Sequence, residues 1–210
     1  MNEQRTEQWF ADRLGCLTAS RLADALDFTA KGAEGAKRKQ YRLELIAERL
    51  TGQKTEFFEN FAMRWGTEKE PEARLEYEFL TDNSVTETGF IKHPLIEWAG
   101  ASPDGLIGAD GAIEIKCPTS TTHLQWMLAG VVPEQHIYQM LWQMACSGRK
   151  WCDFVSFDPR MPEGLRLFIR RFEPAKAEIK AIETQAIEFL LTVNAMCAEI
   201  ENIGTLKLSS

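Results

Sequence analysis

Apolar residues recur at steps of three and four along much of the chain, which is the period of an amphipathic helix. The longest such pattern predicts a helix over about 175–203, with an apolar face formed by Ile179, Ile182, Ala186, Leu190, Val193, Cys197 and Ile200. Shorter patterns predict helices over about 6–14, 37–51, 63–80, 123–128 and 134–147, and a short helix through Leu22 and Leu26. Thr18 or Ser20 is expected to cap that short helix, and Gly52 to end the helix over 37–51.

Runs of β-branched and aromatic residues predict strands between these helices. They lie near 85–91, 97–101, 112–116, 151–157 and 165–172. Asp110-Gly111 is a turn signal, and it predicts a hairpin that brings residue 104 back alongside residue 114. No linker is long enough to mark a domain boundary, so we expect one α/β domain over 1–210, with a mixed central β-sheet flanked by helices.

Composition places the chain among ordinary globular proteins. It has 210 residues, 44% of them hydrophobic, and no segment approaches the ~20 apolar residues that span a bilayer. Five cysteines form no CxxC pair, and the first residues have no apolar signal region, so we expect a cytoplasmic protein with reduced thiols and no membrane association.

Charge is spread unevenly. The net charge of −7 argues against a protein that coats nucleic acid by bulk charge. Residues 31–42 nevertheless hold five bases and one acid, about +4, and residues 66–78 hold five acids and two bases, about −3. Either run can be a solvated helix face. Together they also suit a carboxylate-rich site with a separate basic approach surface for DNA, in which Lys31, Lys37, Arg38 and Lys39 contact the duplex backbone.

Three residues with complementary chemistry fall on the predicted hairpin. Glu114 and Lys116 alternate with Ile113 and Ile115, so they point to one face of the strand, and Asp104 returns alongside them. Carboxylates are preferred Mg²⁺ ligands, and a lysine can position or help deprotonate an attacking water. Taken alone, such spacings are common, and the bare pattern favours a solvated hairpin with a surface Glu–Lys pair.

The residues around this trio, and further segments of the chain, resemble the motifs of a known protein family. Five segments stand in order over about residues 8–190: Trp9 with Arg13-Leu14-Gly15 and Thr18-Ala19-Ser20, Arg64-Trp65-Gly66 with Glu70, Ser102-Pro103-Asp104-Gly105-Leu106, Glu114-Ile115-Lys116-Cys117-Pro118, and Asp158-Pro159-Arg160-Met161. The chain thereby resembles the PD-(D/E)xK nucleases, and within them the lambda-exonuclease branch of YqaJ-type phage recombination exonucleases. The resemblance implies a restriction-endonuclease-like core.

The same resemblance implies an activity and its cofactor. The activity is Mg²⁺-dependent digestion of linear double-stranded DNA from the 5′ end to mononucleotides, leaving a 3′ single strand. Two Mg²⁺ ions, for which Mn²⁺ can substitute, would be held by Asp104, Glu114, the Ile115 carbonyl and Glu70, with Lys116 assisting the water. Glu70 also lies three residues after Thr67, a capping-box spacing, so it has a purely structural interpretation too.

Further roles come from the resemblance alone. Arg13, Ser20, Ser102 and Gln139 would form a pocket for a 5′-terminal phosphate. Met63 would be an apolar wedge that splits the last base pairs, although a core methionine is an equal alternative. A homotrimer ring and a single-strand-annealing recombinase as partner are implied as well.

Three rival interpretations remain open at this stage. The first is a site-specific or structure-specific endonuclease of the same superfamily, which would cut covalently closed circular DNA. The second is a non-catalytic DNA-binding scaffold, which would need no metal ion. The third is an unrelated acidic enzyme or adaptor, which would share none of the ordered segments.

Overall fold

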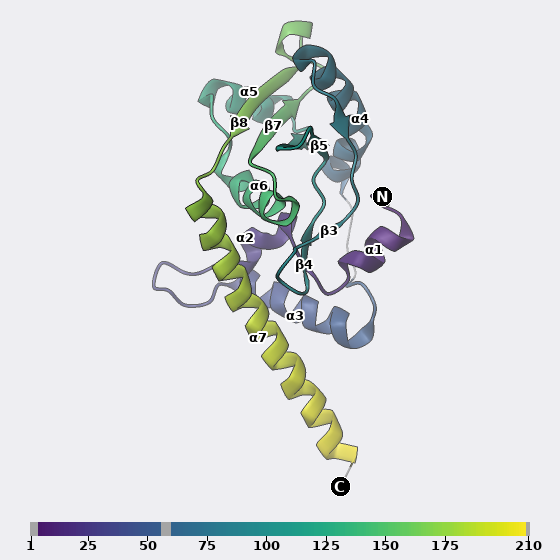
Figure 1. The fold of residues 1–210 in the computed structure, drawn as a ribbon, viewed down its shortest axis with the longest axis vertical. Helices are drawn as coiled ribbons and strands as arrows, with labels where there is room; N and C mark the ends of the chain where they lie inside the picture. The colour runs from purple at the N-terminus through teal and green to yellow at the C-terminus, as the bar shows by residue number, and fades with distance from the viewer. Residues whose placement is uncertain (1–3, 56–59, 209–210) are drawn as a thin grey trace.

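A mixed five-stranded sheet forms the centre of the protein (Figure 1). The computed structural model describes residues 4–55 and 60–208, and within them the sheet runs in the order β2-β5-β6-β7-β8, with a three-stranded sheet in the order β1-β4-β3. The strands are β1 Leu17–Thr18, β2 Val85–Thr86, β3 Ile91–Lys92, β4 Ala99–Ala101, β5 Gly105–Ile107, β6 Gly111–Lys116, β7 Trp151–Phe157 and β8 Leu167–Phe172.

Strand pairing in the large sheet explains its mixed character. Strands β5 and β6 form the antiparallel hairpin expected from the Asp-Gly turn, with Gly105 opposite Ile113. Strand β7 then pairs with β6 in parallel, which needs the crossover through two helices, and β8 returns antiparallel to β7. The expected mixed α/β fold is therefore confirmed.

The helices follow the predicted apolar stripes closely. They are α1 Glu7–Arg13, α2 Leu22–Ala25, α3 Ala36–Thr51, α4 Phe61–Thr81, α5 Ser120–Ala129, α6 Glu134–Ser147 and α7 Lys176–Leu208, with 3₁₀ turns at Ala19–Arg21 and Glu163–Leu165. Gly52 ends α3 in the left-handed conformation, at φ +65°, as its position predicted.

Several element boundaries differ from expectation. Asn60, not Thr67, caps α4: the Asn60 side chain accepts from the backbone N–H of Met63 at 3.0 Å, and Thr67 lies inside the helix. The expected strand over 85–91 is two short strands, β2 and β3, in different sheets. The side chain of Thr18 makes no capping hydrogen bond.

The two faces of β6 are buried against different helices. Ile113 and Ile115 pack with Ala73 and Tyr77 of α4 on one face. Ala112 on the other face belongs to a cluster with Met140 and Met144 of α6. Because strand residues alternate, Glu114 lies on the α6 face of the sheet, where it is fully buried.

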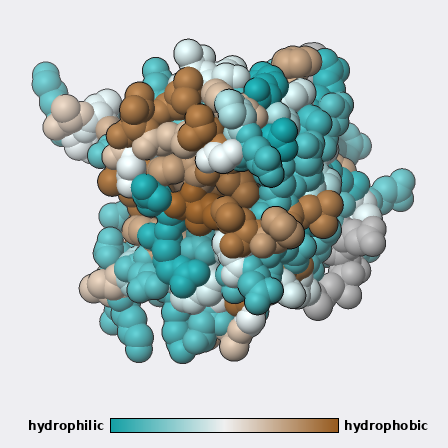
Figure 2. Space-filling view, turned by 90° about the horizontal axis from the view of Figure 1, so that it is seen from above, coloured by the Kyte–Doolittle hydropathy of each residue, from teal (hydrophilic) through white to brown (hydrophobic). Residues whose placement is uncertain are grey.

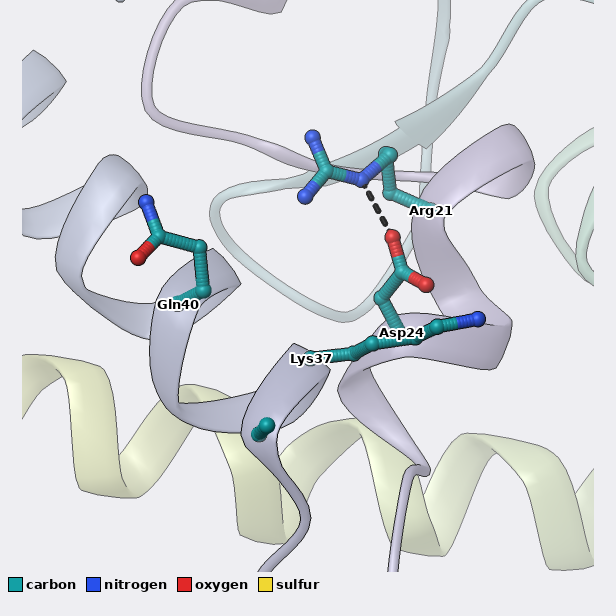
Figure 3. A pocket seen from close by; sticks show the side chains of 5 residues that line it. Arg21, Asp24, Lys37 and Gln40 are labelled. Atoms are coloured by element: carbon teal, nitrogen blue, oxygen red, sulfur yellow. Dashed lines mark hydrogen bonds and ion pairs between the residues drawn. The ribbon is translucent and has the colours of Figure 1, made fainter.

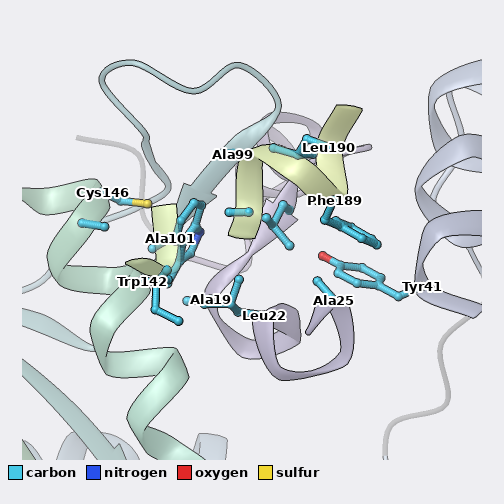
Figure 4. Packing of buried hydrophobic residues seen from close by; sticks show 14 of the residues in the cluster. Ala19, Leu22, Ala25, Tyr41, Ala99, Ala101, Trp142, Cys146, Phe189 and Leu190 are labelled. Atoms are coloured by element: carbon cyan, nitrogen blue, oxygen red, sulfur yellow. The ribbon is translucent and has the colours of Figure 1, made fainter. Parts of the chain in front are cut away.

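The largest apolar core joins the first and last thirds of the chain. Tyr41 of α3 stacks on Phe189 of α7, with ring centroids 5.7 Å apart and an interplanar angle of 18°. Figure 4 shows this pair packed with Leu22 of α2, while Trp142 of α6 lies on the far side of the same cluster. The remainder of α7 extends away from the body as a single long helix (Figure 1).

The surface seen from above is partly apolar (Figure 2). Helix α4 lies at this end of the molecule, and it exposes Leu75, Phe79 and Leu80, of which Phe79 is 93% exposed. Of the helices within residues 4–55 and 60–208, none combines the length and the apolar character needed to cross a bilayer.

Candidate active site

The β5–β6 hairpin brings Asp104 and Glu114 together. Asp104 stands one residue before β5, and its Oδ2 accepts a hydrogen bond from the backbone N–H of Ile115 at 2.6 Å. Glu114 and Lys116 share one face of β6, and the Lys116 ammonium forms an ion pair with Oε1 of Glu114. The three groups predicted from the sequence thus lie within one small volume.

The charged side chains in this volume alter one another's pKa values. Burial raises the pKa of Asp104 well above its usual range, and repulsion from Glu114 and Glu70 raises it further, against the opposing effect of Lys116. Burial lowers the pKa of Lys116, but attraction to Glu114, Asp104 and Glu70 outweighs this effect and raises the pKa overall. Lys116 is therefore a fixed cation here, suited to positioning water and stabilising negative charge.

Glu70 approaches the same volume from α4 but is held by arginines. Its Oε1 accepts from Arg74 at 3.1 Å and its Oε2 from Arg5 at 3.2 Å. Among the described residues, no three His, Cys, Asp or Glu side chains are grouped closely enough to hold a metal ion by themselves. The carboxylates of Asp104 and Glu114 nevertheless fit a divalent ion. Burial and then repulsion from Glu114 raise the pKa of Asp104, and a bound cation would offset both effects.

Gln143 of α6 is a site residue that sequence reasoning missed. Its Nε2 donates to Oε2 of Glu114 at 2.5 Å, and its side chain is fully buried. The signal was the spacing along α6: Gln143 stands four residues after Gln139, one helical turn further, on the face that covers the sheet. The family resemblance pointed to Gln139 and not to this second glutamine.

A cavity of about 910 Å³ opens over these groups. Asp104, Ile115 and Lys116 line it together with Glu70, Arg13 and Ser20; we call it the Asp104 cavity. Met63 lies at the N-terminal end of α4, lines this cavity and is 41% exposed, so it is not a core methionine.

The four residues expected to meet a terminal phosphate are only partly assembled. Oγ of Ser102 accepts from Nη1 of Arg13 at 3.1 Å and from Nε1 of Trp9 at 2.9 Å. The Arg13 guanidinium also lies 4.1 Å from the centre of the Trp9 ring, which fixes its direction. Gln139 is half-buried on α6 and does not line the Asp104 cavity.

The basic residues expected to contact the duplex divide into two kinds. Lys31, Lys37 and Lys39 are exposed. Lys37 borders a shallow pocket of about 340 Å³ with Gln40 and the Arg21–Asp24 ion pair (Figure 3). Arg38 does not fit the expectation: it is 7% exposed and donates to the carbonyl of Ala25, so its charge stabilises the α2–α3 packing.

The Asp158-Pro159-Arg160-Met161 segment contacts both the chain after β6 and helix α4. The carboxylate of Asp158 accepts from Nε of Arg160 at 2.6 Å, and Nη2 of Arg160 donates to the carbonyl of Pro118 at 3.0 Å. The Arg160 guanidinium also covers the ring of Trp65 on α4, 4.9 Å from its centre. This segment therefore ties the end of β6 to α4, the two elements that carry Lys116 and Glu70.

Comparison with known proteins gives the family. Residues 8–150 match the model of the YqaJ-like viral recombinase domain. The chain belongs to this family. The resemblance seen in the five ordered segments is thus confirmed, and family membership makes the chain a nuclease of viral recombination.

Solved structures agree with the YqaJ assignment. An alkaline exonuclease, LHK-Exo, from Laribacter hongkongensis is 46% identical and superposes with a TM-score of 0.88 over 95% of this chain and 98% of its own. The structure of LHK-Exo in complex with dAMP gives the same values. A phage-related exonuclease from Haemophilus somnus 129PT, 15% identical, shares the fold with a TM-score of 0.67 over 88% of this chain and 96% of its own. No curated protein matches the chain.

Proposed function

We propose that this YqaJ-family nuclease is a Mg²⁺-dependent exonuclease that digests linear double-stranded DNA from the 5′ end. It releases mononucleotides and leaves a 3′ single strand for recombination by strand annealing. The observation that carries this proposal is the placement of Asp104 and Lys116 on the wall of a cavity large enough for a DNA end, with Glu114 buried beside them. The 46% identity to an alkaline exonuclease supports the exonuclease part of the proposal.

Asp104, Glu114, the Ile115 carbonyl and Glu70 would hold two Mg²⁺ ions, or Mn²⁺ in their place. Bound divalent ions supply a nucleophilic water and neutralise charge on the phosphate. The Lys116 ammonium, paired with Glu114, orients the attacking water and stabilises the negative charge that develops. Glu70, whose Oε2 accepts from Arg5 in this structure, would also help to hold the ions.

Contacts to the DNA end follow from the walls of the Asp104 cavity. Arg13, oriented by Trp9 and Ser102, provides the charge for a 5′-terminal phosphate, and Ser20 lines the same cavity, whereas Gln139 would reach the phosphate only from outside these walls. Met63, exposed beside the cavity, is placed to wedge between the last base pairs.

Lys31, Lys37 and Lys39 bind the duplex backbone through charge alone. Replacing all three with alanine should weaken duplex binding and flatten its salt dependence, because each phosphate contact releases counterions. The slope of log affinity against log salt, measured by fluorescence anisotropy, should fall by about one for each contact that is lost. An unchanged slope would remove these lysines from the interface.

The assembly and its setting belong to the same proposal. The protein acts in the cytoplasm as a homotrimer ring, which keeps the digested strand from escaping, and hands its product to a single-strand-annealing recombinase. The exposed apolar side chains of α4, Leu75, Phe79 and Leu80, support association with another protein surface. Light scattering with size-exclusion chromatography measures the number of subunits directly.

One digestion experiment tests the central proposal. Linear duplexes carrying a 5′-phosphate or a 5′-hydroxyl, and labelled at either end, are incubated with and without Mg²⁺. We expect mononucleotides from the 5′ strand, a preference for the phosphate and no product in EDTA. Release of the 3′ label first would overturn the direction of digestion, and product without metal would overturn the mechanism.

Closed circular DNA separates the proposal from its rivals. An exonuclease leaves the circle intact, whereas an endonuclease of the same superfamily linearises it. A scaffold that binds without cutting would leave both substrates unchanged in Mg²⁺. The acids at 104 and 114 and the lysine at 116, brought together by the hairpin, argue against that scaffold.

A further inference from the structure

Gln143 is a polar side chain on the buried face of α6. Its neighbours on α6, Met140 and Met144, pack into the apolar cluster beneath the sheet. Gln143 itself is fully buried and makes its side-chain hydrogen bond to a residue 29 positions away, Glu114. An apolar side chain of similar size would fill the same space, so packing alone does not account for an amide here.

The hydrogen bond fixes the direction of the amide. A carboxylate without a proton only accepts hydrogen bonds, so the amide nitrogen must face Oε2 of Glu114 at 2.5 Å. The other end of the amide, Oε1 of Gln143, is buried without a hydrogen-bond partner among the described residues. Leaving a buried acceptor unpaired costs free energy. The residue therefore fits a functional role at Glu114 better than a purely stabilising one.

Each oxygen of the Glu114 carboxylate therefore has a partner of its own. Oε1 faces the Lys116 ammonium and Oε2 faces the amide of Gln143, so the carboxylate is restrained from both sides. Each carboxylate oxygen has a second lone pair for a further contact. Without the amide, the carboxylate can turn fully toward Lys116, because no second donor opposes that attraction.

We propose that Gln143 is a positioning residue that holds Glu114 in the orientation in which it binds the divalent ion. This inference rests on the proposed metal-dependent nuclease function. Gln143 touches neither the DNA nor the ion. It acts as a neutral donor, so it fixes the carboxylate without adding a charge to a volume that already holds three acids and a lysine.

Gln143→Met tests the proposal, because methionine has nearly the same length but no donor. Mn²⁺ alone is titrated into the DNA-free protein by isothermal calorimetry, and digestion is measured over a range of Mg²⁺ concentrations. We expect Mn²⁺ affinity to fall about 10–100-fold. We also expect half-maximal activity to need correspondingly more Mg²⁺, with recovery of the rate at high Mg²⁺ and an unchanged KM for DNA.

Two further variants separate positioning from folding. Met144→Leu changes an equally buried residue on the same helix and should leave Mn²⁺ affinity unchanged. Gln143→Asn keeps an amide but is one methylene shorter, so it should weaken Mn²⁺ binding in the same direction even if Gln143→Met does not fold.

Three results would overturn the Gln143 proposal or the function on which it rests. Wild-type affinity for Mn²⁺ in a folded Gln143 variant overturns the proposal, and so does unfolding of both variants, which would make the role purely structural. If the wild-type protein neither binds Mn²⁺ nor digests DNA, the proposed function itself fails, and that result is distinguishable from failure of the Gln143 inference.

Discussion

The Lys116 ammonium lies between a buried acid and the open side of the Asp104 cavity. Its pKa is raised by the surrounding carboxylates, despite the opposing effect of burial, so it stays charged throughout the physiological pH range. A permanent cation at this position favours the transition state of phosphodiester hydrolysis more than the bound DNA.

We therefore expect Lys116→Ala to lower the single-turnover digestion rate about 10²–10³-fold, while duplex affinity measured in EDTA changes little. Lys150→Ala is the matched control, because that lysine is 72% exposed and pairs with Asp110 in a surface turn. An equal loss of binding and turnover in Lys116→Ala would remove the catalytic role of the lysine.

His136 makes stability depend on pH. It stacks on Phe154 and meets the edge of Trp126, and burial, assisted by the charge of Lys116, lowers its pKa to about 4. In the unfolded chain a histidine titrates near 6.5. Between these two values the unfolded state binds more protons, so the free energy of unfolding falls as the pH falls from about 6.5 toward 4.

His136→Phe keeps the aromatic stack and removes the proton site. Between pH 7 and pH 4.5, the free energy of unfolding, measured with urea, should fall by about 2 kcal/mol more in the wild type than in the variant. Each unit of difference between the folded and unfolded pKa contributes up to about 1.4 kcal/mol. Parallel pH dependences for the two proteins would contradict this assignment.

At the scale of elements, α4 combines structural and site roles. It covers one face of the sheet through Ala73 and Tyr77, and it presents Gly66, Met63 and Glu70 to the Asp104 cavity. A β-carbon built at Gly66 meets no atom within 4 Å. Glycine within a helix lowers stability, but because it has no side chain it leaves that side of the cavity open.

Gly66→Ala should stabilise the protein by about 0.5–1 kcal/mol, because alanine loses less backbone entropy in a helix. Digestion should slow in the same variant, because the methyl group narrows the Asp104 cavity. Thermal unfolding and initial rates measure the two effects. Gly164→Ala is the control, since it also adds a methyl group in open space but away from the cavity, and it should leave the digestion rate unchanged.

At the scale of the whole molecule, α7 joins parts of the chain that are far apart in sequence. It contacts both α3 and α6, and its buried residues include Ile182, Ala186, Phe189 and Val193. Beyond Cys197 the described side chains are exposed. Among the described side chains of this long helix, the buried contacts therefore lie before Cys197.

Phe189→Ala should lower the free energy of unfolding by about 3–5 kcal/mol, because it removes a fully buried ring stacked on Tyr41. Ile200→Ala on the same helix should change it by about 0.5 kcal/mol or less, since Ile200 is 39% exposed. Urea titrations compare the two. Equal losses would place the outer part of α7 in a buried contact.

The sequence by itself determined most of the elements and the principal site trio. Helix α6 and strand β7 have the predicted bounds, because their apolar periods and the glycine after α6 are local signals. The Asp110-Gly111 turn and the alternation of β6 likewise fix where Asp104, Glu114 and Lys116 lie relative to one another.

Only the tertiary structure decided which other side chains reach that trio. Gln143 meets Glu114 because α6 crosses beneath β6, and Arg38, expected on the DNA surface, is buried because α2 and α3 close around it. The cap of α4 at Asn60 is likewise a feature that the structure shows and the sequence did not single out. These contacts join residues by packing rather than by a repeating local pattern, and packing is set by the whole core at once.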